Sequence, residues 1–345
     1  MKSKRIGLGE ALGISISKDA PLQQRNLANA IEKDLEAFET RLLERLTLAN
    51  RLGDVPSRYL AEAGGKRVRP ILVFLTARLG NGVNDDVFTA AEAVEIIHLA
   101  TLYHDDVMDE APQRRGVPSV HSVWGNSVAI LTGDLLLAKA SRLIIGLNPE
   151  GQDEQAKTFE RLVTGQLLET VGPAEGADPI EHYLQVLADK TASLIALSAK
   201  FGVMYSDAPR EYQQPLTEYG EALGIAFQLI DDVIDLSNSP KTGKVAGTDL
   251  RAGVETMPSL LLSGRSDEDS KLLRASIDKV LNQEATEAEA DAAIAALAKH
   301  PVTKETVAEA RKYAGIAKDA LAILKDGAVK SVLLSFADAI VNRNR

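Results

Sequence analysis

The chain has 345 residues, of which 45% are hydrophobic and 26% charged, so it is long enough to bury a large core in one or two domains. The absence of cysteine excludes disulfides, thiolate catalysis and zinc–sulfur sites, and only five histidines argue against a histidine-rich metal site. A net charge of −10 and a pI near 5.2 disfavour binding to nucleic acid or to anionic membrane surfaces.

The first 20 residues contain three glycines and precede Pro21, and we predict that residues 1–20 form a loose N-terminal arm. They lack the apolar core of a signal peptide, and no later stretch approaches the ~20 apolar residues of a membrane-spanning helix. We therefore expect a cytoplasmic protein without a transmembrane segment. From Leu22 onward, apolar residues recur at steps of three and four, which predicts a helix face formed by Leu27, Ile31, Leu35 and Phe38.

A glycine turn followed by three cations comes next. It consists of Gly64, Gly65, Lys66, Arg67 and Arg69, and is followed by Pro70, a residue that favours the first turn of a helix. Arginine forks and lysine ammonium groups are common phosphate ligands. Taken alone, such a cluster is better explained by surface salt bridges, so its meaning depends on its neighbours.

The next helix, predicted over residues 87–109 with a cap at residues 84–86, ends in acidic residues embedded in apolar sequence. This first cluster is Asp105-Asp106-Val-Met-Asp109, and Arg114-Arg115-Gly116 follows it. Residues four apart share one helix face, with Cβ atoms ~5–6 Å apart, so Asp105 and Asp109 present their carboxylates side by side. Such carboxylates repel one another and resist desolvation, and a cation between them removes both penalties.

The rest of the chain continues the helical pattern, and alternating strand patterns are scarce. We predict helices over residues 126–146, 153–171, 180–205, 210–236, 256–263, 269–282, 286–298, 302–324 and 328–342, with breaks at 148–151, 172–173, 178–179 and 237–253. No break has the composition of a domain linker. The sequence therefore predicts an all-α chain with a single helical domain over residues 21–345.

A second acidic cluster of the same design stands 126 residues after the first. It is Asp231-Asp232-Val-Ile-Asp235, and Lys241 and Lys244 follow it in sequence, whereas Lys190 lies inside an earlier predicted helix. One such cluster could be a solvated helix end, but a matched pair accompanied by cations indicates bound metal and a bound diphosphate. Hard oxygen ligands favour Mg²⁺, with Mn²⁺ as an alternative.

The aspartates of the two clusters divide into two roles. The predicted metal ligands are Asp105, Asp109, Asp231 and Asp235, the last either directly or through a water. The middle residues, Asp106 and Asp232, lie ~100° further around their helices and are expected to orient neighbouring groups.

A glutamate and a histidine precede the first cluster on its helix. Glu95-Ile-Ile-His98 matches the Glu-x-x-His step that di-iron bundles use twice, but the chain has no second copy. We therefore expect His98 to hydrogen-bond a phosphate or to fill a position in the core.

These motifs resemble those of the trans-isoprenyl diphosphate synthases, and in particular of the longer-chain polyprenyl diphosphate synthases. The resemblance covers about residues 57 to 265. It is carried by Gly65-Lys66-x-x-Arg69-Pro70, by the first cluster with Arg114-Arg115-Gly116, by Lys190-Thr191, by Phe227-Gln228 with the second cluster, and by Gly243-Lys244 with Gly247-Thr248-Asp249. One position departs from the family: a lysine is common where this chain has Val254, and Arg251 is a candidate substitute.

The resemblance implies a fold and an activity. The fold would be a single large helical bundle of the isoprenoid synthase type around a central cavity, and the protein would be a homodimer. The enzyme would be a prenyltransferase that adds isopentenyl diphosphate head-to-tail, in trans configuration, to an allylic diphosphate such as farnesyl or geranylgeranyl diphosphate.

The resemblance also implies roles for individual residues. Isopentenyl diphosphate would bind to Gly65, Lys66, Arg69, His98 and Arg115. The allylic diphosphate would bind through magnesium and directly to Arg114, Lys190, Thr191, Gln228 and Lys244. The catalytic set would be Asp105, Asp109, Asp231 and Lys190.

Product length would be set on the helix that carries the first cluster. One helical turn rises ~5.4 Å, close to the length of one isoprene unit. Proceeding from Asp105 towards the N-terminus, the residues expected to line the channel are Thr101, Ala100, Ile97 and Ala93. The small side chains at 100 and 101 leave room where aromatic ones would close the channel, so we expect products longer than four isoprene units.

Two other functions are compatible with parts of the pattern. A class I terpene cyclase also ionises its substrate at a first aspartate motif, but its second motif usually differs from the one here, and Lys66 and Arg69 would have no second diphosphate to bind. A noncatalytic partner subunit of a synthase would be expected to lose aspartates, whereas this chain keeps all six.

Overall fold

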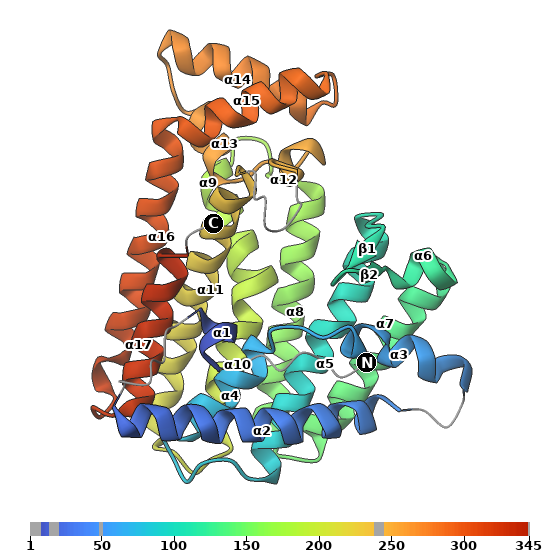
Figure 1. Cartoon of the computed structure of the whole chain (residues 1–345), viewed down its shortest axis with the longest axis vertical. Coiled ribbons are helices and arrows are strands. Elements are labelled where there is room, and N and C mark those ends of the chain that lie inside the picture. The colour runs from blue at the N-terminus through green and yellow to red at the C-terminus, as the bar shows by residue number, and fades with distance from the viewer. Residues whose placement is uncertain (1–7, 14–20, 48–50, 238–244, 344–345) are drawn as a thin grey trace. The chain divides into compact units, whose positions relative to one another are not determined.

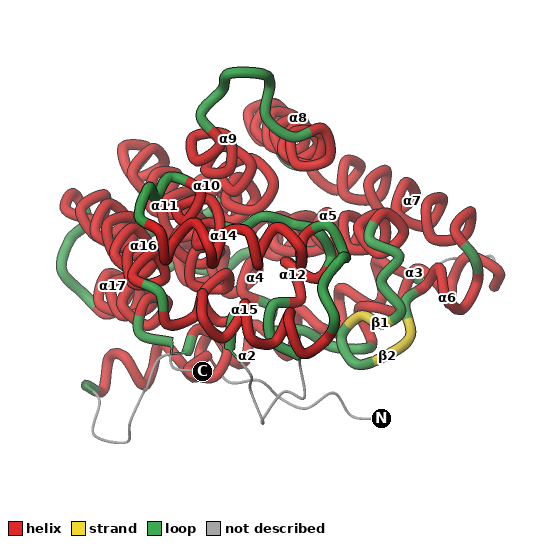
Figure 2. The backbone as a smooth tube through the Cα atoms, turned by 90° about the horizontal axis from the view of Figure 1, so that it is seen from above, coloured by secondary structure: helices red, strands yellow, loops and turns green. Residues whose placement is uncertain are grey.

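The computed structural model describes residues 8–13, 21–47, 51–237 and 245–343 (Figure 1). Within these ranges the chain is almost entirely helical, and Figure 2 shows the short strand pair β1–β2 in yellow among the helices. The predicted all-α class is confirmed. Of the helices described, none is long and apolar enough to cross a membrane. The cytoplasmic location stays a prediction.

The chain divides into two compact units that alternate along the sequence. Unit 1 comprises residues 1–160, 194–220 and 321–336, and unit 2 comprises residues 161–193, 221–320 and 337–345. The predicted single domain over residues 21–345, and the cavity at its centre, stay predictions.

Unit 1 contains the N-terminal helices and the first acidic cluster. Its elements are α1 (Leu8–Leu12), α2 (Leu22–Leu46), α3 (Arg51–Glu62), α4 (Val68–Ala77), α5 (Asp85–Met108), β1 (Gln113–Arg114), β2 (Val117–Pro118), α6 (Val120–Trp124), α7 (Asn126–Ile145), the first half of α8 (Pro149–Val171), nearly all of α10 (Ser193–Met204), η2 (Arg210–Tyr212), the start of α11 (Gln213–Asp235), η3 (Leu321–Ile323) and most of α17 (Ala328–Val341). α1 lies inside the segment that we predicted to be a loose arm, and its Leu8 and Leu12 are buried.

The core of unit 1 is built around α4 and α5. Every residue of α4 from Pro70 to Ala77 is buried, and α5 packs against α4 and, most extensively, against α7. The predicted face of α2 is confirmed, because all four of its apolar residues named above are buried. α7 approaches α5 closely at Gly133, where any side chain would collide with the imidazole of His104. The helix that carries the first acidic cluster is therefore fixed along its length.

Unit 2 contains the second acidic cluster. Its elements are the second half of α8, α9 (Pro179–Val186), the π-helical turn η1 (Leu187–Ala192), the rest of α11, α12 (Thr248–Arg251), α13 (Met257–Ser263), α14 (Glu268–Leu281), α15 (Glu287–Lys299), α16 (Pro301–Ala320) and the end of α17. Figure 1 shows α14 and α15 lying against each other as an antiparallel pair.

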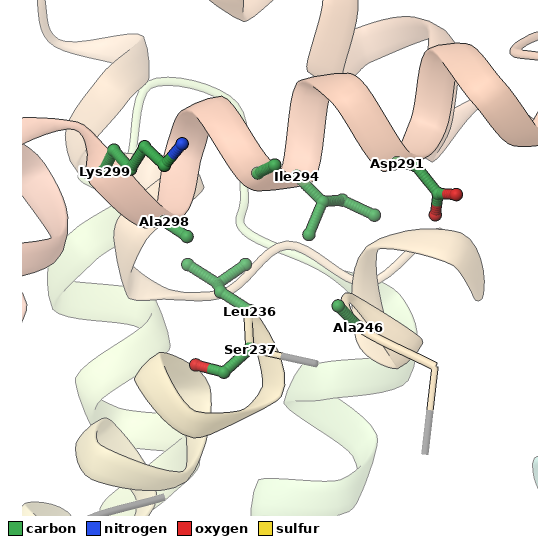
Figure 3. Close-up of a pocket in the computed structure, with 8 residues that line it drawn as sticks. Leu236, Ser237, Ala246, Asp291, Ile294, Ala298 and Lys299 are labelled. Carbon is green, nitrogen blue, oxygen red and sulfur yellow. The ribbon is translucent and has the colours of Figure 1, made fainter. Parts of the chain in front are cut away.

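The core of unit 2 links the end of α11 to α14 and α15. Leu236 belongs to the same buried cluster as Ile277 of α14 and Ile294 of α15. Ile294 also packs so closely on Gly247, whose φ is +69°, that a side chain there would collide with it. A pocket of about 310 Å³ opens between the end of α11 and α15, lined by Leu236, Ser237, Ala246, Asp291, Ile294, Ala295, Ala298 and Lys299 (Figure 3).

Most predicted helices match the observed ones to within one or two residues, but some differ. α8 begins at Pro149, not at 153, because proline suits the first turn of a helix and the Asn148 side chain accepts a 2.7 Å hydrogen bond from Gly151 N. The single helix predicted over residues 180–205 is α9, η1 and α10, so it contains a π-helical turn. The predicted break at 237–253 contains α12, and its residues 238–244 lie outside the described part of the chain.

Candidate active site

The first acidic cluster lies at the C-terminal end of α5. Asp109 N donates to Asp105 O at 2.8 Å, so the two residues stand one helical turn apart. Asp109 is exposed and Asp105 is half-buried. The predicted one-turn spacing of these two residues is confirmed, and the binding of a metal by their carboxylates stays a prediction.

The middle aspartate of this cluster holds Arg114. Asp106 is 1% exposed, and its Oδ1 accepts a 2.6 Å hydrogen bond from Arg114 Nε. Burial raises the pKa of Asp106 above its ordinary value, although the bond from Arg114 opposes this effect. Asp106 Oδ2 is buried and has no hydrogen-bond partner among the described residues. The group that Asp106 is expected to orient is therefore the guanidinium of Arg114.

The β1–β2 hairpin contains two consecutive arginines, Arg114 and Arg115, which contact different partners. Arg114 pairs with Val117 across the hairpin, and the two residues of its turn, Arg115 and Gly116, have φ values of +55° and +77°. The guanidinium of Arg115 donates to Leu60 O at 2.9 Å and also to Gly64 O. Arg115 is therefore directed at the glycine turn between α3 and α4.

The glycine turn requires glycine for two reasons. Gly64 and Gly65 have φ values of +95° and +150°, which side-chain-bearing residues rarely adopt. A Cβ on Gly65 would also lie 3.0 Å from the Arg115 guanidinium carbon. Two predicted ligands of isopentenyl diphosphate, Gly65 and Arg115, are thereby brought into contact. Lys66, a third, is exposed at this turn.

Arg69 and His98 complete this cationic group. Burial lowers the pKa of Arg69 to about 10, with Glu95 opposing the shift and Arg115 adding to it. Burial and the charges of Arg69 and Arg115 hold the pKa of His98 well below its ordinary value. Arg69 Nε is buried without a hydrogen-bond partner among the described residues. An anion placed here would therefore relieve both the mutual repulsion of the cations and the missing hydrogen bond.

A buried glutamate holds the cationic group together. Glu95 is 2% exposed, accepts a 2.7 Å bond from Arg67 Nη1, and lies 3.9 Å from Arg115 Nη2. Arg67 has φ +52° and also binds Glu39 through Nε at 2.7 Å. Burial tends to lower the pKa of Arg67, but the two glutamates raise it above its ordinary value. Glu95 is therefore the partner of two arginines, which explains the Glu-x-x-His step without a di-iron site.

The predicted chain-length residues lie inside unit 1. Ala93, Ile97 and Ala100 are buried on α5, and Thr101 is half-buried with its hydroxyl donating to His98 O at 2.9 Å. Their role in setting product length stays a prediction.

The second acidic cluster, in unit 2, has a partner from the end of the chain. Arg343 Nη1 lies 3.2 Å from Asp231 Oδ1, and its guanidinium carbon sits 4.6 Å from the centre of the Phe227 ring. Asp231 is half-buried. In this structure one predicted metal ligand is thus paired with a cation that a metal ion would have to displace.

The other two aspartates of this cluster make structural hydrogen bonds. Asp232 Oδ2 accepts from Tyr183 Oη at 2.8 Å and from Met257 N at 3.2 Å, and burial raises its pKa to about 7. Asp235 Oδ2 accepts from Asp249 N at 3.2 Å. Asp232 therefore ties α11 to α9 and α13, and its role in orienting neighbouring groups of the site stays a prediction. Over the described ranges, no three carboxylate or imidazole side chains cluster as a metal site.

Lys190 and Thr191 lie within η1, and both are half-buried. The Lys190 ammonium pairs with Glu169 of α8, so a phosphate at Lys190 would compete with this carboxylate for its positive charge. Gln228 is half-buried on α11. Lys244, the remaining predicted ligand of the allylic diphosphate, lies with Gly243 and Lys241 outside the described residues.

Arg251 is a poor substitute for the lysine that Val254 replaces. Its guanidinium binds Glu287 at 2.8 Å and Asp291 at 2.5 Å, and its Nε donates to Ala246 O at 3.0 Å. These bonds use the donors of the Arg251 guanidinium and direct it towards α15.

Comparison with known proteins decides the family. The family model described as polyprenyl synthetase matches residues 51–297. The chain belongs to the polyprenyl synthetase family. This polyprenyl synthetase is 44% identical over 319 residues to the nonaprenyl diphosphate synthase of Mycobacterium tuberculosis, and the match covers 92% of this chain and 94% of that relative.

Solved structures of polyprenyl synthetases show the same fold. A decaprenyl diphosphate synthase from Rhodobacter capsulatus is similar with a TM-score of 0.83 and 31% identity, over 93% of this chain and 99% of that one. A geranylgeranyl pyrophosphate synthase from Corynebacterium glutamicum, complexed with calcium and isoprenyl diphosphate, is similar with a TM-score of 0.80 and 37% identity, over 92% and 97%. The predicted isoprenoid synthase fold and the prenyltransferase class of enzyme are confirmed.

Four residues around the predicted ligands do not stand out in the sequence. They are Arg161, Tyr183, Asp189 and Arg343, each of which contacts or adjoins a predicted site residue or its immediate neighbour. Arg67 and Glu95 do stand out, but no sequence pattern pairs them. The glutamate in the apolar run before His98 is the signal for such a pair, because glutamate is rarely fully buried without a cationic partner.

Proposed function

We propose that this polyprenyl synthetase is a trans-polyprenyl diphosphate synthase that extends an allylic diphosphate, such as farnesyl or geranylgeranyl diphosphate, by isopentenyl units to a product longer than four isoprene units. The observation that carries the proposal is the cationic group around the Gly64–Gly65 turn, whose charges and unpaired Arg69 Nε favour a bound anion, in a chain that also carries two acidic clusters. The full-length similarity to a nonaprenyl diphosphate synthase supports the product class.

Isopentenyl diphosphate binds the cationic group of unit 1 in this proposal. Lys66, Arg69 and Arg115 supply the positive charge, and the backbone of Gly65 supplies a donor. Because the pKa of His98 is held well below its ordinary value, the imidazole enters the complex neutral and makes a hydrogen bond to the diphosphate. The bound anion satisfies Arg69 and offsets the repulsion between Arg69 and Arg115.

The allylic diphosphate binds the acidic clusters through a divalent cation. The carboxylates of Asp105, Asp109, Asp231 and Asp235 are the hard oxygen donors that Mg²⁺ prefers, with Mn²⁺ as an alternative. They fit the ion by type, and the two residues of each cluster stand one helical turn apart. Bound there, the cation would supply electrostatic stabilisation of the departing diphosphate.

The protein's own residues act on the same diphosphate. Lys190 exchanges Glu169 for a phosphate oxygen, and Arg114, held by Asp106, presents its remaining donors. Thr191, Gln228 and Lys244 supply further polar contacts. These fixed donors stabilise the charge that grows as the allylic carbon–oxygen bond breaks.

The reaction then balances without a protein base. The isopentenyl double bond attacks the allylic carbon, a carbon–carbon bond forms, and the released diphosphate takes the proton that is lost. Water must be excluded from the cation, which is the role proposed for the apolar residues of α5 that precede the first cluster.

We also propose that the protein acts as a homodimer. Apolar side chains on α6 and α7 are exposed, at 47% for Val123, 42% for Ile130, 66% for Leu131 and 37% for Leu135. Such grouped exposure favours a protein contact, and light scattering at micromolar concentration tests it.

The function is tested with purified protein, labelled isopentenyl diphosphate, farnesyl diphosphate and Mg²⁺, followed by mass analysis of the products. We expect prenyl diphosphates longer than four isoprene units. A hydrocarbon product would instead indicate a terpene cyclase, and no turnover without an added protein would indicate a partner subunit. Either result would overturn the proposal.

A further inference from the structure

The helical run after α9 contains a π-helical turn at the point where the predicted diphosphate ligands lie. η1 spans Leu187–Ala192 and includes Lys190 and Thr191. A π-turn inserts one extra residue into a helix, which rotates the residues after it by ~100° relative to a regular helix. The contacts that hold this turn therefore determine where Lys190 and Thr191 point.

Two buried glycines press on η1 from two different helices of unit 2. A Cβ on Gly165 of α8 would collide with Lys190 N and would lie 3.0 Å from Asp189 C. A Cβ on Gly224 of α11 would lie 2.5 Å from Ala192 Cα. Neither glycine has a positive φ, so the requirement comes from close approach of backbones and not from conformation. Glycine weakens a helix interior, and its use at two positions facing one turn indicates a packing or functional reason.

An ion triad lies beside the two glycines. Arg161 of α8 donates from Nε to Asp189 Oδ1 at 2.8 Å and also pairs with Glu221 of α11. Gln185 Nε2 donates to the other oxygen of Asp189 at 2.6 Å. Asp189 is 6% exposed, so its charge depends on these partners. The carboxylate next to Lys190 is therefore fixed from both sides.

The α8 contacts follow the helical repeat. Arg161, Gly165 and Glu169 are spaced four apart, so they lie on one face of α8, and they contact in turn Asp189, the backbone of Lys190 and the Lys190 ammonium. Three successive turns of α8 thus contact η1.

We propose that these residues form a clamp that keeps η1 in its π-helical form and so positions Lys190 and Thr191 for the allylic diphosphate. The η1 clamp consists of Arg161, Gly165, Asp189, Glu221 and Gly224. Its members are positioning residues, since they act through the backbone and side chains of η1. The inference rests on the proposed function, in which Lys190 and Thr191 bind that substrate.

Two alanine substitutions test the clamp. The Cβ added by Gly165→Ala pushes η1 away from α8, and the Cβ added by Gly224→Ala pushes η1 away from α11. We expect kcat/KM for the allylic diphosphate to fall at least tenfold in each variant. KM for isopentenyl diphosphate should stay within twofold, because its predicted ligands lie in unit 1. The matched control is Gly315→Ala on α16, where an added Cβ meets nothing within 4 Å. A loss within twofold of this control, or equal losses for both substrates, would overturn the clamp.

A charge variant keeps the test decisive if the alanine variants do not fold. Asp189→Asn preserves the shape of the side chain and its acceptor but removes the charge that Arg161 binds. We expect a several-fold rise in KM for the allylic diphosphate at unchanged KM for isopentenyl diphosphate, and unchanged KM for both would reject the clamp. Failure of the proposed function is distinguishable, because the wild-type protein itself would then form no prenyl diphosphate.

Discussion

Replacing Glu95 by glutamine removes the negative charge at the centre of the cationic group while nearly preserving the shape of the side chain. Removing one partner of a buried ion pair costs ~3–5 kcal/mol. Arg67 keeps Glu39 through bonds of 2.7 and 3.1 Å, and glutamine still offers Arg67 an acceptor, so we expect the lower end, about 3 kcal/mol. For a chain of 345 residues, an unfolding entropy of ~2.1 cal/mol/K per residue makes each kcal/mol worth ~1.4 °C, so the melting temperature should fall by ~4 °C.

The assay is thermal unfolding followed by circular dichroism, with and without inorganic pyrophosphate. Glu62→Gln is the matched control, since Glu62 also binds an arginine, Arg58, at 2.6 Å, but is 50% exposed. An exposed pair at this spacing contributes only ~0.3–0.5 kcal/mol. Pyrophosphate should raise the melting temperature of Glu95→Gln more than that of the wild type, because it replaces the missing negative charge. Equal melting temperatures for the Glu95 and Glu62 variants would refute the reasoning.

Three further predictions address the site. Glu169→Gln releases Lys190 from its ion pair, so KM for the allylic diphosphate should fall several-fold in initial-rate measurements, and an unchanged KM would speak against Lys190 as a ligand. The pKa of His98 is depressed in the folded state, so His98 takes up a proton when the protein unfolds below about pH 6.5. The contribution of the neutral imidazole to stability is therefore present above that pH and is lost as the pH falls. His98→Gln should therefore flatten the decline in urea-unfolding free energy between about pH 7 and 5, by up to ~1.4 kcal/mol per pH unit, and parallel curves for both proteins would contradict this. Ala100→Phe should shorten the product seen by mass analysis in a variant that still folds, and an unaltered product ladder would refute the direction of the channel.

Local signals were enough to predict much of the fold and the one-turn spacing within the first acidic cluster. Asn84 caps α5 as predicted, accepting from Val87 N at 2.8 Å, because capping depends only on residues three apart. The faces of α2 and the one-turn spacing of Asp105 and Asp109 follow from helical periodicity alone. Pro149 was misjudged because proline marks a break as readily as it starts a helix.

Contacts between distant parts of the chain were beyond sequence reasoning. Arg67 and Glu95 are 28 residues apart, and Arg343 and Asp231 are 112 apart, so no periodicity relates them. The sequence also does not reveal the π-turn of η1, because the apolar repeat itself alternates between three and four residues, so one extra residue does not stand out. The family resemblance named Lys190 as a ligand, but it could not show which residues position Lys190.

The central claim is that the carboxylates of both acidic clusters bind the divalent cation that draws diphosphate away from its prenyl chain. Turnover of Asp105→Ala and Asp231→Ala, measured across a Mg²⁺ titration beside the exposed control Asp86→Ala on the same α5, tests it most directly. We predict that both cluster variants keep the helical circular-dichroism signal and lose turnover by orders of magnitude at every Mg²⁺ concentration, while Asp86→Ala retains it. Wild-type turnover in either cluster variant would contradict the claim.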